Sequence, residues 1–219
     1  MTDVLFAFDL RETLQGVFDD YGVWTYGILF LVIFAETGLV VAPFLPGDSL
    51  LFTAGLFARP ESGAFNLYLL MGLLMAASFI GDNTNFWVGR WLGRKAFKNE
   101  DSRIFKRQYL EKTRQFYERH GRKTIIIGRF VPIVRTFAPF VAGMDAMEYR
   151  SFVGASAVGA VVWVSVCVLS GYFFGRIPWV EQNFELVILG VIGLSVVGIV
   201  VEFIRTRAES RRQPAEPES

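Results

Sequence analysis

Four ionisable residues stand close to helix-breaking prolines in otherwise apolar parts of the sequence: Glu36, Asp48, Arg129 and Arg135. An ionised side chain at the centre of a membrane helix costs roughly 2.5–3.5 kcal/mol on insertion scales, so these residues must be paired or hydrated. Arginine keeps its charge and binds phosphate through parallel hydrogen bonds, whereas a carboxylate can exchange protons. The pattern indicates a site for an anionic phosphate group, to which the hydroxyl of Thr136 could add a contact.

The same charges also suit a purely structural role. Two acids and two arginines can neutralise one another in a buried ion-pair network that holds helices together. We favour a functional site, because apolar contacts would often stabilise the protein as well as such a network. Three polar residues of the next apolar region predict either a helix face that lines the same cavity or hydrogen bonds between helices: Asp82, Asn83 and Asn85.

The composition indicates a membrane protein. Of the 219 residues, 53% are hydrophobic and only 20% are charged, and the mean hydropathy is +0.39. The net charge of +1 gives no reason to expect a nucleic-acid partner. One cysteine, Cys167, and one histidine, His120, leave no set of residues for a cysteine-ligated metal or a two-histidine phosphatase. We therefore expect no metal, no other cofactor and no enzymatic activity.

The apolar regions predict an all-α polytopic membrane protein. Three full transmembrane helices are expected at 64–92, 150–176 and 183–204, since each can cross a core of roughly 30 Å at 1.5 Å per residue. The regions 22–57 and 124–146 contain prolines beside charges, and we predict two re-entrant helical hairpins there, with kinked spans as the alternative. The predicted hairpin breaks are Pro43, Pro46, Gly47, Pro132, Pro139 and Gly143.

Positive charge predicts the orientation of the chain. Residues 90–123 hold twelve Lys and Arg against four acids, and the tail 205–219 carries four more arginines. The positive-inside rule places the basic loop 93–123 and this tail, whose composition indicates disorder, in the cytoplasm. The loop is expected to be helical and to bind anionic lipid or form a solvated linker. Residues 1–21 form either an amphipathic segment on the membrane or a frayed lead-in.

Two halves of the sequence repeat the same order of features. FLPGDSLLFTAG and later FWVGR in the first half correspond to FVPIVRTFAPFVAG and YFFGR in the second. Gly55 then matches Gly143, and Gly89 matches Gly175. One span lies between the two hairpins, so the second would enter from the opposite face. This inverted repeat is typical of secondary transporters, whose sites lie near the membrane midplane. The hairpin tips would bring the two acids towards the two arginines.

Several segments resemble the DedA family of bacterial inner-membrane proteins, which is related to eukaryotic VTT-domain proteins. They are FAETGLVVAPFLPGDSLLF, GDNTNFWVGR, YLEKTRQFYERHGRKTI and RFVPIVRTFAPFVAGM, and the similarity extends over 21–204. The resemblance implies paired re-entrant hairpins, a multi-pass location in the inner membrane and movement of undecaprenyl phosphate across it. The family's essential acids map onto Glu36 and Asp48, and its arginine pair maps onto Arg129 and Arg135.

These observations together predict a proton-coupled flippase for a polyprenyl-phosphate carrier lipid. Arg129, Arg135 and Thr136 would bind the phosphate, while Glu36 and Asp48 would take up protons. The partners are then membrane lipids and protons. Two alternatives are a proton-coupled transporter of small ions or solutes and a phospholipid scramblase. Small residues of the last span suit helix packing within one chain or in a homo-oligomer.

Overall fold

The computed structural model describes residues 10–39, 47–58, 65–96 and 107–183, with Leu186, Val187, Gly190 and Gly193 beyond them, and these residues fold as helices and short connections. Among the described residues, two helices are long and apolar enough to cross a membrane: Leu67–Leu92 within α3 (Leu67–Ala96), and α7 (Tyr149–Phe174). Each stretch of 26 residues measures about 39 Å. They correspond to the predicted spans 64–92 and 150–176, whereas the span predicted at 183–204 falls largely outside the described residues.

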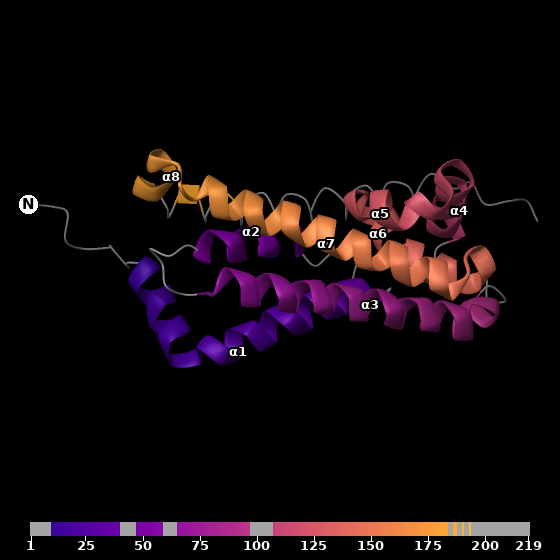
Figure 1. Ribbon diagram of the computed structural model, residues 1–219, viewed down its shortest axis with the longest axis horizontal. Coiled ribbons are helices and arrows are strands. Elements are labelled where there is room, and N and C mark those ends of the chain that lie inside the picture. The colour runs from indigo at the N-terminus through magenta and orange to yellow at the C-terminus, as the bar shows by residue number, and fades with distance from the viewer. Residues whose placement is uncertain are drawn as a thin grey trace, which may run out of the picture.

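Helices α3 and α7 run along most of the length of the molecule, and the other helices divide into two groups beside them (Figure 1). Helices α1 (Leu10–Gly38) and α2 (Gly47–Phe57) lie in one half. The other half holds α4 (Arg107–His120), α5 (Thr124–Ile127) and α6 (Pro132–Val141). Helix α8 (Pro178–Gln182) follows α7 at the end where α1 begins. The architecture is therefore all-helical, with two long helices shared by both halves.

The region of the first predicted hairpin contains the second part of α1 and the whole of α2. Helix α1 runs without a break from Leu10 to Gly38, and it therefore crosses the predicted boundary at residue 21 between a separate N-terminal segment and the hairpin. Pro43 and Pro46 lie outside the described residues, as do residues 1–9 and all side chains up to residue 21. Gly47 begins α2 and places Asp48 in its first turn, where the positive end of the helix dipole favours a carboxylate.

The second predicted hairpin is broken at Val131. Helix α5 passes into the 3-10 helix η2 (Gly128–Phe130), and Val131 is extended, with φ −114° and ψ 110°. A residue before proline avoids the helical conformation, and Pro132 at the first position of α6 lacks an N–H that would have no partner there. Pro139 lies inside α6, and Gly143 lies in the π-helix η3 (Ala142–Ala146) that follows.

The basic loop contains a helix that packs against the rest of the molecule. Helix α3 extends into this loop as far as Ala96, and residues 97–106 are not among the described residues. Helix α4 confirms the prediction that the loop is helical. Tyr117 of α4 is buried and donates a hydrogen bond of 2.9 Å to the carbonyl oxygen of Ala138 in α6. Burial raises the pKa of the Tyr117 phenol, which keeps this donor protonated. Helix α4 is therefore docked on α6 and differs from a solvated linker.

The core is divided into two apolar clusters. One joins α1 and α2 to the first half of α3 and the second half of α7, and includes Ile33, Leu51, Leu74 and Val168. The other joins α4, α5 and α6 to the opposite ends of the same two helices, where Phe86 stacks on Phe152 at 4.5 Å between ring centroids. Buried polar residues lie between the clusters: Ser78, Asp82 and Asn85 of α3, and Ser156 of α7. In this polar layer, Ser78 and Asp82 lie near the middle of the span 67–92, and Ser156 lies in the first third of α7.

Glycines allow the two halves to cross at very short distance. Gly55 of α2 lies against Gly171 of α7, and Gly143 of η3 lies against Gly89 of α3. The first glycine of each pair faces two backbone atoms of the opposite helix: the carbonyl oxygen three residues before the partner glycine, and the amide nitrogen one residue after that glycine. A Cβ on any of these four glycines would overlap backbone atoms. The structure therefore matches Gly89 with Gly171. The predicted match with Gly175 is wrong, because Gly175 follows the end of α7.

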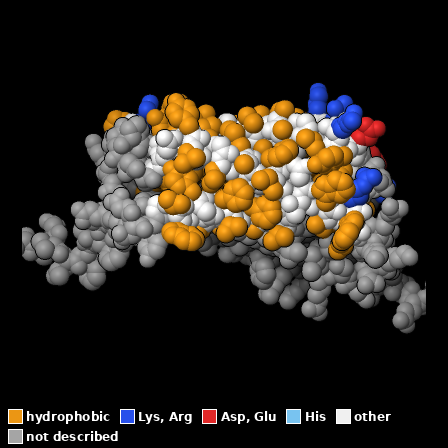
Figure 2. Space-filling view, turned by 60° about the horizontal axis from the view of Figure 1, so that its bottom comes forward, with side chains coloured by type: hydrophobic (Ala, Val, Ile, Leu, Met, Phe, Trp, Pro, Cys, Tyr) orange, Lys and Arg blue, Asp and Glu red, His pale blue; other side chains and the backbone are white. Residues whose placement is uncertain are grey.

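The outer surface is apolar over the long helices. Figure 2 shows hydrophobic side chains spread over one face, with charged side chains gathered towards its ends. A soluble monomer seldom exposes so extensive an apolar surface, whereas a bilayer would cover it. The exposed large side chains include Trp24, Ile28 and Leu31 of α1, Tyr68, Leu69, Trp87 and Trp91 of α3, and Val158, Val161, Val166 and Phe173 of α7.

Candidate functional site

Arg135 joins the two halves of the molecule. It projects from α6, its Nη1 donates a hydrogen bond of 2.8 Å to Asp48 Oδ1, and its Nη2 pairs with Glu36 Oε1. Two acids of the first predicted hairpin thus meet one arginine of the second. The Glu36 side chain is fully buried and that of Arg135 is 8% exposed, whereas that of Asp48 is 60% exposed. An ion or headgroup from outside would therefore reach Asp48 first.

Gly47 makes the pairing of Glu36 possible. The Glu36 carboxylate lies against Gly47, at the place that a Cβ would occupy. A larger residue there would push the carboxylate away from Arg135. Gly47 was predicted as a hairpin break, and the structure gives it this second role.

Arg129 has different partners from those that the sequence predicted. Its Nη2 pairs with Asp82, and its Nη1 donates a hydrogen bond of 2.6 Å to Ser78 Oγ. Ser156 Oγ donates to the same Asp82 oxygen at 2.6 Å. Arg129 and Asp82 have side chains only 3% and 5% exposed. This cluster is a closed network between η2, α3 and α7, with no part in it for Glu36 or Asp48.

The extended Val131 between the two arginines explains the difference. Arg129 precedes this break and faces the spans, whereas Arg135 follows it on α6 and faces the first half. Gly159 of α7 provides the space for Arg129, because the side chain of Arg129 lies where a Cβ of residue 159 would stand. The prediction that both arginines share the two acids is therefore wrong for Arg129.

Trp163 lies beside both arginines, and the sequence did not predict this role for it. Its indole ring lies 5.7 Å from the guanidinium carbon of Arg129 and 5.3 Å from that of Arg135, measured to the ring centroid. Its Nε1 donates a hydrogen bond of 2.7 Å to Asp48 Oδ1, and the residue is 1% exposed. Tryptophan in membrane proteins is enriched at the membrane interfaces, so its position in the middle of a span is the signal that could have found it.

The three predicted cavity-lining residues of α3 have different roles. Asp82 is the partner of Arg129, as described above. Asn85 donates to the carbonyl oxygens of Thr37 at 3.1 Å and Thr136 at 2.8 Å, and so ties α1 to α6. Asn83 bonds to Phe79 of its own helix and accepts a hydrogen bond from Tyr149 at the surface. The polar layer therefore includes Asp82, Asn85 and Thr136, but not Asn83.

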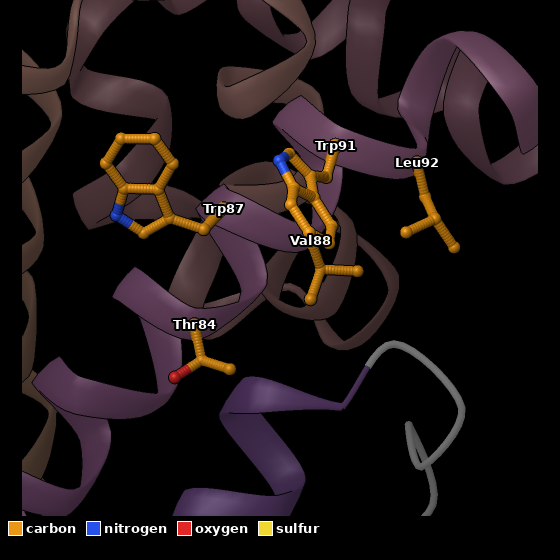
Figure 3. A pocket seen from close by; sticks show the side chains of 5 residues that line it. All are labelled: Thr84, Trp87, Val88, Trp91 and Leu92. Atoms are coloured by element: carbon orange, nitrogen blue, oxygen red, sulfur yellow. The ribbon is translucent and has the colours of Figure 1, made fainter.

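The surface of α3 also carries an apolar hollow of about 430 Å³. Figure 3 shows its five lining side chains, all from one stretch of α3: Thr84, Trp87, Val88, Trp91 and Leu92. None of them belongs to the predicted charged site. Within the described part of the chain, no group of three or more His, Cys, Asp or Glu residues stands together as a metal site would require.

The fold and the polar layer define a helical membrane protein with a charged site between its two halves. Residues 45–173 match the VTT domain. The chain is 53% identical over 207 residues to Protein DedA of Escherichia coli (strain K12), covering 94% of each chain. It is 41% identical over 188 residues to an uncharacterized membrane protein of Mycobacterium tuberculosis (strain ATCC 25618 / H37Rv), covering 86% of this chain and 82% of that one. Inner membrane protein YghB of Escherichia coli (strain K12) is 34% identical over 159 residues, covering 72% of this chain and 71% of its own.

The chain therefore belongs to the DedA family of membrane proteins. This confirms the resemblance that its motifs indicated. No solved structure matches the chain.

Proposed function

We propose that the protein is a transporter that moves a polyprenyl phosphate, such as undecaprenyl phosphate, across the bacterial inner membrane. The observation that carries the proposal is the contact between Arg135, which is buried, and Asp48, which is exposed. A buried ion pair is weak support for stability, since apolar residues often replace one without loss. An arginine that is held at mid-depth by an accessible carboxylate is instead suited to exchange that carboxylate for a phosphate.

The charges give each residue a role in this exchange. Arg135 binds the phosphate once the Asp48 carboxylate has left its guanidinium. Protonation of Asp48 weakens this ion pair, because a neutral carboxyl attracts a guanidinium less. Glu36 stays beside Arg135 and keeps its guanidinium in place. Arg129 is occupied by Asp82 and Ser78, so we assign it to holding the second half against the spans. The isoprenoid tail would remain in the bilayer against the apolar outer surface.

The internal symmetry supports a transport cycle. We interpret α1 with α2, and α5 with α6, as re-entrant hairpins of an inverted repeat, in which two glycine contacts of the same geometry relate the halves. Broken helices that meet at the midplane are the usual place of a transporter's site. We place the end of the molecule that carries α4 in the cytoplasm, because its exposed residues include Arg114, Arg119, Arg122, Lys123 and Arg150.

The proposal is tested in proteoliposomes that contain fluorescently labelled undecaprenyl phosphate. Wild-type protein should move the label between leaflets faster than empty liposomes, and a pH gradient should change the rate. Arg135→Lys should abolish most of this activity, because a single ammonium lacks the fork with which Arg135 holds Glu36 through Nη2 and presents Nη1 at the position of Asp48. Arg150→Lys, at an exposed position, is the matched control. A wild-type rate equal to that of empty liposomes would overturn the proposal.

The same vesicles distinguish the other two functions. Proton flux that depends on the protein but needs no lipid substrate would favour a transporter of small ions or solutes. Redistribution of ordinary phospholipids without any gradient would favour a scramblase. We infer transport and no enzymatic step in all three cases.

A further inference from the structure

Two hydrogen-bond donors converge on one oxygen atom of the Asp48 carboxylate. Asp48 Oδ1 accepts from Arg135 Nη1 at 2.8 Å and from Trp163 Nε1 at 2.7 Å. One donor is charged and the other is neutral, and they come from different helices, α6 and α7. Such a pair of fixed donors forms a binding position for a single anionic oxygen.

The donors are held in place by groups other than Asp48. Arg135 is fixed through its second nitrogen by the buried Glu36, and its guanidinium lies over the indole ring at 5.3 Å. Trp163 is 1% exposed and is packed in the first apolar cluster. The carboxylate that they share is different, because the Asp48 side chain is 60% exposed. Of these four groups, Asp48 is the one that can leave without opening the core.

We propose that Trp163 is a ligand for the phosphate headgroup, and that Asp48 occupies the binding position as an internal competitor until a phosphate oxygen replaces it. The inference rests on the proposed function and adds the binding residue and the competitor. In the occupied state, Trp163 Nε1 and Arg135 Nη1 donate to one phosphate oxygen at the point where Asp48 Oδ1 now lies. The chemistry that is recognised is that of a phosphate monoester.

The other arginine does not share this ligand. Arg129 Nη1 donates to Ser78, and Arg129 Nη2 is bonded to Asp82 and to the carbonyl oxygen of Ser156 at 3.5 Å. Its side chain is 3% exposed. The phosphate site therefore consists of one arginine and one tryptophan, in place of two arginines.

Charge explains why Asp48 must compete with the ligand. Arg135 contacts two carboxylates, so the three groups carry a net negative charge when both acids are ionised. A phosphate that binds beside both would meet repulsion from Asp48 as well as finding its position filled. Removal of the Asp48 carboxylate should therefore strengthen phosphate binding, although the same acid is needed for turnover.

The experiment measures equilibrium binding to the purified full-length protein in a maltoside detergent, which contains no phosphate. The probes are undecaprenyl phosphate, undecaprenol and inorganic phosphate. Trp163→Phe keeps an aromatic ring beneath the guanidiniums but removes the N–H donor. Loss of one hydrogen bond to a charged group should raise the Kd for undecaprenyl phosphate about tenfold. Trp179→Phe, at a residue of α8 that is 60% exposed, is the matched control and should leave the Kd unchanged.

A second variant tests the competitor in the opposite direction. Asp48→Ala should lower the Kd for undecaprenyl phosphate several-fold. The Asp48 side chain is 60% exposed, so its loss should leave the fold intact, and a misfolded protein would not bind more tightly. A third protein retains Trp163 as its one tryptophan, with phenylalanine at 24, 87, 91 and 179. Its fluorescence should change with undecaprenyl phosphate and stay constant with undecaprenol.

The outcomes separate this inference from the proposed function. If wild-type protein does not bind undecaprenyl phosphate, the proposed function itself fails. If wild-type protein binds it, but Trp163→Phe binds equally well or Asp48→Ala binds no more tightly, the inference fails and the transporter proposal stands. Binding of inorganic phosphate with the same dependence on Trp163 would identify a free anion as the ligand, which supports the site but not the lipid substrate.

Discussion

Replacement of Asp82 by asparagine should destabilise the protein more than the same change at any exposed acid. The guanidinium of Arg129 would lose its ionised partner inside a network whose two charged side chains are 3% and 5% exposed. Breaking a buried pair by removing one partner costs about 3–5 kcal/mol, because the remaining charge is left uncompensated. The reference is Asp48→Asn, where 60% exposure of the side chain limits the expected loss to about 1 kcal/mol.

The assay is unfolding in mixed micelles with increasing SDS, followed by far-ultraviolet circular dichroism, for wild-type protein and both variants. A third variant, Asp82→Leu combined with Arg129→Met, removes both charges together and should recover most of the stability lost in Asp82→Asn. The reasoning would be refuted if Asp82→Asn were as stable as Asp48→Asn, or if the double variant were less stable than the single one. Either result would mean that Arg129 is solvated or paired elsewhere in the folded protein.

Further predictions concern close contacts and one buried phenol. Gly47→Ala should displace the Glu36 carboxylate and reduce transport to the level of Arg135→Lys, whereas Gly72→Ala, where a Cβ meets nothing within 4 Å, should leave transport unchanged. Gly171→Ala should lower the unfolding free energy by at least about 1–3 kcal/mol in the SDS assay, because the added methyl overlaps the backbone of α2. Tyr117→Phe should lower the unfolding free energy by about 1 kcal/mol at pH 7, because the buried hydrogen bond to Ala138 is lost. Since burial raises the pKa of Tyr117, the wild type should lose this advantage as the pH rises above about 10, the ordinary tyrosine pKa, and Tyr117→Phe should not.

The sequence predicts the parts of the fold that depend on composition along the chain. Long apolar runs predict spans at 64–92 and 150–176, where the structure has helices over 67–92 and 149–174. The predicted break at Pro132 lies next to the observed one at Val131, since Pro132 begins α6. The meeting of Arg135 with the acids of the first half follows from two broken segments that point towards each other. These features need only local chemistry and the direction of each segment.

The remaining features depend on how helices are rotated, which a single sequence does not specify. Arg129 and Arg135 are six residues apart, but the extended residue between them turns their side chains to different neighbours. Trp163 is one aromatic residue in an apolar run, and its role arises from the two arginines that reach it from elsewhere in the chain. The correspondence of Gly89 with Gly171 follows from their backbone contacts with Gly143 and Gly55. The Gly-Arg pairs in the sequence carry no information about these contacts.

The crossed glycine contacts restrict how this molecule can move. Helix α2 is seated on α7, and η3 is seated on α3. In the sequence, α2 and α3 belong to the first half and η3 and α7 to the second, so each contact joins the two halves of the sequence. Neither half of the sequence can therefore move away from the other as a rigid body without breaking both glycine contacts. If the protein transports a lipid as proposed above, a passage for its headgroup would have to open by rotation about these two contacts, and the ion pairs of Arg129 and Arg135 would resist that rotation.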